Sequence, residues 1–343
     1  MSRLGLALLV LLLAAPSRAG ERVLYFFNWS EYLPESVLEG FTAEIGIRVV
    51  YTTYDGNEAM YAKVKLLDGA GYDLVVPSTY YVSRMRREGL LHELDHARLA
   101  NLGNLDPRHL DQPFDPGNRY SVPYLWGTTG IAVNAGAVDT SKVHAWSDLW
   151  NPAWAGRLLL LNDLRDVFTV SLHVLGFSGN STDPEQVRLA YEHLLKLVPG
   201  VRIFNSDSPK VPYLSGEADI GMIWNGEAYV AAQEDSAILY VYPRDGAILW
   251  MDSLVIPRRA EHLAEAHAMI DYLLRPEVAR AISEEVGYAS PNRAAVAQMP
   301  PEVRHNRTVY PDPEQLAGAE YQVDIGESIA LYNRYWELLK AGR

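Results

Sequence analysis

The chain has 343 residues, of which 48% are apolar, and its 43 Asp and Glu against 30 Lys and Arg give a formal net charge of −13. This acidic balance argues against a nucleic acid as partner and favours the attraction of a cationic ligand. The length and apolar content predict two folded lobes and argue against a disordered chain.

The N-terminus has the pattern of a cleaved secretory signal. Arg3 precedes an unbroken apolar run from Leu4 to Ala15, and the small-residue site Ser17-Arg18-Ala19 follows Pro16. We therefore expect residues 1–19 to be removed on export and no membrane insertion of the mature chain. The sequence contains no cysteine, so disulfides are excluded and stability must come from the cores.

The first half of the mature sequence alternates between strand and helix patterns. Strands are predicted at Val23 to Phe27, Arg48 to Tyr54 and Asp73 to Ser78, with helices at about 34–44 and 57–67 between them. This β-α-β-α-β order predicts a parallel sheet with right-handed crossovers.

The alternation resumes after an extended segment, Tyr120 to Asn134. Later expected elements are strands at Arg157 to Leu161, Val201 to Phe204, Ile220 to Trp224 and Leu239 to Tyr242, a crossing strand at Ala247 to Pro257, and helices at 260–274 and 325–339. Together they predict an α/β fold of two lobes, each a mainly parallel sheet flanked by helices, with a ligand cleft between them. We assign 20–127 and 254–310 to the first lobe, 128–253 to the second, and 311–343 to a segment packing on both.

In open parallel sheets, ligands bind beyond the carboxyl ends of the strands. The residues at those ends repeat one chemistry, namely aromatic rings beside carboxylates: Trp29, Ser30, Glu31, Tyr32, Ser78, Tyr80, Asp163, Leu164, Arg165, Asp166, Trp224, Trp250 and Asp252. Carboxylates pair with an organic ammonium and ring faces suit the cation and its methylenes. Each residue also has a structural alternative, because Glu31 and Asp163 suit helix caps, Trp29 and Trp224 a core, and Asp252 a solvated turn.

Arg165 is out of place in a cation site. We expect it to hold Asp163 or Asp166 by a forked hydrogen bond, and the alternative is an exposed surface charge.

Enzyme and metal motifs are weak. His92 to His96 matches H-E-x-x-H, but Asp95 interrupts the apolar face that such a helix needs and no third ligand follows at the expected spacing. We therefore expect no metal, no cofactor and no catalytic residue. A sugar-binding protein or a carbohydrate enzyme with paired carboxylates is the alternative, since rings also stack on sugars.

Motifs in one order along the whole mature chain point to a known family. FNWSEYLPES, GYDLVVPSTYYV, PYLWGTTGIAVN, MIWNG, WMDSLVIP, LLRPEVA and GYASPN resemble the bacterial periplasmic spermidine/putrescine-binding proteins. The resemblance implies a type II-like periplasmic binding protein that closes around a polyamine and delivers it to the membrane permease of an ABC importer.

The family's ligand-contacting residues can be assigned to this chain by matching the motifs position by position. Ser30 stands where the family has threonine and Asp166 where it has glutamate. The full set implied is Trp29, Ser30, Glu31, Tyr32, Ser78, Tyr80, Asp163, Leu164, Arg165, Asp166, Trp224, Trp250, Asp252, Tyr288 and Gln322. The four carboxylates Glu31, Asp163, Asp166 and Asp252 suit three ammonium groups better than two, so spermidine is expected to bind more tightly than putrescine.

Overall fold

The computed structural model describes residues 22–342. The predicted signal segment, residues 1–19, lies outside the described residues. No helix formed by residues 22–342 is long and apolar enough to cross a membrane.

The first half folds as predicted. β1 (Val23–Trp29), α1 (Glu35–Ile45), β2 (Arg48–Tyr54), α2 (Asn57–Leu66) and β3 (Leu74–Val75) follow in order, and β1 pairs in parallel with both β2 and β3. The third strand is shorter than the predicted Asp73 to Ser78. Only Leu74 and Val75 pair with β1, and Pro77 has no N–H to continue a ladder.

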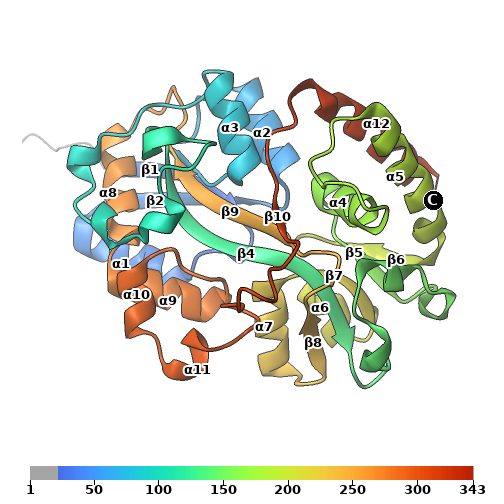
Figure 1. Cartoon of the computed structure of the whole chain (residues 1–343). Coiled ribbons are helices and arrows are strands. Elements are labelled where there is room, and N and C mark those ends of the chain that lie inside the picture. The colour runs from blue at the N-terminus through green and yellow to red at the C-terminus, as the bar shows by residue number, and fades with distance from the viewer. Residues whose placement is uncertain (1–21, 343) are drawn as a thin grey trace, which may run out of the picture.

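Two long strands connect the halves of the molecule. β4 (Ser121–Asn134) and β9 (Ile248–Val255) run antiparallel along each other, with Val122 opposite Leu254 and Thr129 opposite Ile248. Figure 1 shows them crossing the middle of the molecule side by side. They join all strands into one sheet of order β2-β1-β3-β9-β4-β7-β5-β6, in which β10 pairs with β9 and β8 with β4.

The second half carries the remaining predicted strands. They are β5 (Leu158–Leu160), β6 (Val201–Phe204), β7 (Ile220–Trp224) and β8 (Ile238–Val241). β5 is parallel to β6 and β7, whereas β7 and β8 run antiparallel to β4. The leucine run of β5 is buried along its whole length, as a central parallel strand requires.

Helices surround the sheet. The longer ones not yet named are α3 (Thr79–Arg87), α4 (Leu164–Val174), α5 (Pro184–Leu197), α7 (Asn225–Glu234), α8 (Leu263–Leu273), α9 (Pro276–Val286) and α12 (Ile329–Ala341), and the short elements are α6 (Lys210–Leu214), α10 (Arg293–Gln298), α11 (Pro301–Arg304) and β10 (Glu320–Tyr321). The helix predicted at 325–339 corresponds to α12. It starts four residues later than predicted, because a 3-10 turn at Gly326–Ser328 precedes it.

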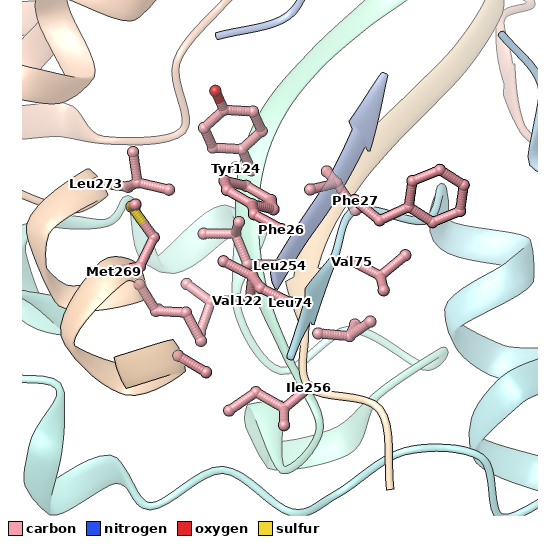
Figure 2. Close-up of a cluster of buried hydrophobic side chains, with 14 of the residues drawn as sticks. Phe26, Phe27, Leu74, Val75, Val122, Tyr124, Leu254, Ile256, Met269 and Leu273 are labelled. Atoms are coloured by element: carbon pink, nitrogen blue, oxygen red, sulfur yellow. The ribbon is translucent and has the colours of Figure 1, made fainter. Parts of the chain in front are cut away.

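The buried apolar side chains form two separate cores. Figure 2 shows part of the first core, where Phe26, Leu74 and Leu254 from the sheet meet Met269 of α8. The second core lies between β5, α4, α5 and α12, and Trp336 of α12 belongs to it. β4 and β9 supply residues to both cores, and the chain passes between the cores a third time from Tyr288, in the first core, to Ile325, in the second. We propose that the first lobe ends at residue 127 and resumes at residue 254, with residues 128–253 forming the second lobe.

Candidate functional site

One pocket lies where the strands of both halves end. It encloses about 580 Å³ including its mouth. Its walls are formed by Trp29, Ser30, Glu31, Tyr32, Asn57, Ser78, Asp163, Asp166, Ser206, Asp207, Pro209, Trp224, Glu227, Trp250, Asp252, Tyr288 and Gln322. These wall residues come from the ends of β1 and β7, from β9 and from the segment after β10. These four parts of the chain are far apart in sequence.

Asp252 is buried in the middle of β9, so it does not lie on a solvated turn. One carboxylate oxygen accepts a hydrogen bond from Tyr32 at 2.8 Å and the other accepts one from Ser78 at 2.6 Å. Burial raises the pKa of this carboxyl to about 7, although the two hydroxyl donors act in the opposite direction. The group is therefore a desolvated acid held in a fixed orientation.

Aromatic rings from both halves meet around the pocket. Trp29 at the end of β1 lies edge-to-face with Trp224 at the end of β7, with ring centroids 6.0 Å apart. Tyr288 packs edge-on against both Trp250 and Tyr32, at 5.2 Å in each case. Such ring faces and edges form an apolar lining into which methylene groups fit without losing hydrogen bonds.

The loop after β5 supplies two more carboxylates. Asp163 caps α4 by accepting a hydrogen bond from the backbone N–H of Asp166 at 2.9 Å, so it lines the pocket and caps a helix at once. Asp166 accepts hydrogen bonds from Gln322 and Thr129, both at 2.7 Å, and from the Trp224 indole at 3.3 Å. Burial and the charge of Asp163 raise the pKa of Asp166 to about 7.

The expected fork from Arg165 to these carboxylates is wrong. Its guanidinium donates to the Val323 carbonyl at 3.0 Å and to Asn180 Oδ1 at 2.9 Å, and it lies over the Tyr80 ring, 5.1 Å from the centroid. It is fully buried, so the alternative of a surface charge is wrong as well. The reason is the helical geometry of α4, which directs Arg165 away from the pocket and towards the segment that carries Gln322.

The pocket wall includes most of the predicted site residues. The exceptions are Leu164, which packs in the second core, Arg165, and Tyr80, whose hydroxyl accepts a hydrogen bond from Asn57 at 3.2 Å behind Ser78. These three support the wall from outside it.

A model of the bacterial extracellular solute-binding protein family matches residues 36–309. The chain belongs to this family.

Relatives of known name are similar over nearly their full length. The spermidine/putrescine-binding periplasmic protein of Escherichia coli K12 is 50% identical over 98% of this chain and 96% of its own. A putrescine/agmatine-binding protein of Pseudomonas aeruginosa PAO1 is 35% identical over 87% of this chain and 86% of its own. These relatives are named as binding proteins, and the chain is accordingly a binding protein and not an enzyme.

Solved structures agree with the two-lobed fold. The spermidine/putrescine ABC transporter substrate-binding protein PotD of Streptococcus pneumoniae superposes with a TM-score of 0.77 at 35% identity, covering 93% of this chain and 99% of that one. The Tp0655 lipoprotein of Treponema pallidum superposes with a TM-score of 0.81 at 29% identity, covering 92% and 99%.

Several wall residues of this binding protein were missed in the sequence, namely Asn57, Ser206, Asp207, Pro209 and Glu227. Asn57 follows β2 and donates to Ser78 at 3.0 Å, and Glu227 lies in the first turn of α7, directly after β7. The strand-end rule would have found Glu227 if the residues after β7 had been followed two positions further. Asn57 lies three residues after β2, and no end residues were considered for that strand. Ser206 to Pro209 follow β6, a strand for which no end residues were considered.

Glu58 is a further carboxylate close to the site. Its Oε1 has no hydrogen-bond partner among the described residues, and burial with the nearby charge of Asp163 raises its pKa to about 8. An acid with this pKa is mostly protonated at neutral pH, and Glu58 is not one of the residues that line the pocket. No group of three or more His, Asp or Glu side chains within 22–342 has the geometry to hold a metal ion.

Proposed function

We propose that this protein captures spermidine, and putrescine more weakly, in the periplasm and delivers it to the permease of an ABC importer. Support comes from the pocket, which offers buried carboxylates and aromatic rings, and from the names of the relatives that are 48 to 50% identical. Export to the periplasm is supported by the predicted signal at residues 1–19.

The state of Asp252 carries the proposal. It is a buried carboxylate that faces a pocket next to Trp250, and its hydrogen-bond partners are two neutral hydroxyl groups. A buried charge without a counter-ion is costly, and a ligand ammonium would remove that cost. A neutral sugar would leave the carboxylate unpaired, which disfavours the sugar-binding alternative.

The charges in the wall favour a triamine. Of the six carboxylates in the wall, Glu31 and Glu227 both pair with Lys210, and Asp207 is exposed to solvent. No ion pair of residues 22–342 involves the other three, Asp163, Asp166 and Asp252. Spermidine brings three ammonium groups to these carboxylates, whereas putrescine brings two and leaves one without a partner. The expected cost to putrescine is about 1 to 3 kcal/mol, the scale of one hydrogen bond to a charged group.

Native mass spectrometry of protein purified without added polyamine tests this function. Retained ligand should appear as a mass increase equal to spermidine. Thermal unfolding with added amines and sugars then separates the candidates, because a ligand that binds the folded state raises the melting temperature. Stabilisation by sugars but by no amine would contradict the proposal.

A further inference from the structure

Lys210 places a cation of the protein itself against two carboxylates of the pocket wall. It is the first residue of α6 and its side chain is largely buried, with 14% exposed. Its ammonium donates to Glu31, at the end of β1 in the first half, and to Glu227 Oε2, at 3.2 Å in the second half. The lysine therefore joins two carboxylates across the pocket.

The two carboxylates held by Lys210 belong to the same wall as the three buried carboxylates without a counter-ion, Asp163, Asp166 and Asp252. Glu31 and Glu227 both line the pocket, and Tyr288, which packs on Trp250 next to Asp252, lies within electrostatic reach of Glu31 and Glu227. The pair is thus positioned like a further ammonium subsite at one end of the pocket. Ser208 completes it, since its hydroxyl lies 3.1 Å from both Lys210 Nζ and Glu31.

The backbone at Glu31 is also unusual. Glu31 has a φ of 51°, in the left-handed region that non-glycine residues rarely adopt. This conformation follows directly on β1 and costs on the order of 1 kcal/mol, and such positions cluster at functional sites.

We propose that Lys210 is a specificity-determining residue whose side-chain ammonium fills an additional ammonium subsite between Glu31 and Glu227. The three buried carboxylates that remain then accept a triamine, and a linear tetraamine has no buried carboxylate left for its fourth ammonium. This inference rests on the proposed polyamine function. It adds which residue sets the number of ligand ammonium groups that the pocket binds.

Calorimetric titration of wild type, Lys210→Met and Lys210→Arg with putrescine, spermidine and the tetraamine spermine tests the inference. Methionine keeps an unbranched apolar stem and removes the charge, whereas arginine keeps a cation. We expect wild type to prefer spermidine over spermine, and Lys210→Met to raise the spermine-to-spermidine affinity ratio by about tenfold or more. Lys210→Arg should keep the wild-type ratio.

Lys142→Met is the matched control, because it removes one exposed positive charge that pairs with Asp139 on the surface of the second half. It should leave the ratio unchanged. An unchanged ratio in Lys210→Met, or an equal change in Lys142→Met, overturns the inference. Equal strengthening of all three amines in Lys210→Met would also overturn it, since Lys210 would then act on closure of the cleft. Wild type that binds no amine contradicts the proposed function instead.

Discussion

Replacing Asp252 by asparagine tests the strongest anchor of the site. Asparagine has the same shape and keeps one acceptor oxygen for one of the two hydroxyl donors, Ser78 at 2.6 Å or Tyr32 at 2.8 Å. The other hydroxyl can rotate to accept from the new amide N–H, so the fold should remain intact. The variant therefore loses the charge offered to the ligand and reverses one of these two hydrogen bonds. The pKa of the Asp252 carboxyl is raised from 3.8 to about 7, which corresponds to about 4 kcal/mol spent on keeping a bare carboxylate in the empty pocket.

A bound ammonium removes most of that cost, and truncating one partner of a buried charge pair typically costs about 2 to 5 kcal/mol. Calorimetric titration of Asp252→Asn with spermidine should therefore show affinity reduced by about 30-fold to several thousandfold, at tenfold per 1.4 kcal/mol. Asp235→Asn is the matched control, because Asp235 is exposed and its side-chain oxygen bonds only the Ala237 N–H. Near-normal affinity in Asp252→Asn would refute the reasoning.

The same variant has a second signature without ligand. A carboxyl whose pKa is raised by folding stabilises the native state at low pH and loses that contribution as pH rises through about 7. Asparagine cannot ionise. The melting temperature of ligand-free Asp252→Asn relative to wild type should therefore be higher at pH 8 than at pH 5, and an opposite trend would show that Asp252 is not a desolvated acid.

Three further predictions follow from the wall and its support. The pKa of Asp252 is raised to about 7 and a bound ammonium lowers it, so spermidine binding should release protons and become tighter from pH 6 to pH 8. Calorimetric titration in buffers of different ionisation enthalpy measures the proton release, and proton uptake would contradict the prediction. Arg165→Met removes the buried hydrogen bonds to Val323 and Asn180 and should lower the free energy of unfolding by about 2 to 4 kcal/mol in urea melts; an unchanged midpoint would show that these bonds contribute nothing. Gly226→Ala would place a Cβ 2.4 Å from the Tyr288 ring, so amine affinity should fall by about tenfold or more although no charge is lost; wild-type affinity by calorimetry would show that the ring position is unimportant.

The sequence was sufficient to predict the succession of strands and helices in the first half and the parallel pairing of its strands, because alternating β-α patterns and short connections leave few topologies. β6 and β7 have the predicted bounds. β3 was predicted too long because hydrophobic pattern alone does not reveal how many residues find a partner strand.

The site was predictable where residues follow a strand directly, as Trp29 and Asp163 do. Gln322 could not be derived from its surroundings in sequence, because its place beside Asp166 depends on how the segment after β10 crosses the sheet. Arg165 shows the opposite failure. Its neighbours in sequence are the two carboxylates, but adjacent residues of an α-helix point about 100° apart, and its real partners lie 14 or more residues away.

Lys210 is the clearest case of information that only the tertiary structure holds. The sequence from Ser208 to Lys210 contains no binding motif, and Glu31 was predicted to bind a cation of the ligand. The two meet because the first half brings the end of β1 to the start of α6 in the second half.

A crystal structure of the protein grown with spermidine tests the central claim most directly, because it examines ligand and site together. We predict one spermidine in the pocket, with an ammonium nitrogen within hydrogen-bond distance of the Asp252 carboxylate and methylenes against Trp250 and Trp29. The other ammonium groups should contact Asp163 or Asp166. An empty pocket at saturating spermidine, or an amine bound outside it with Asp252 still unpaired, would contradict the account.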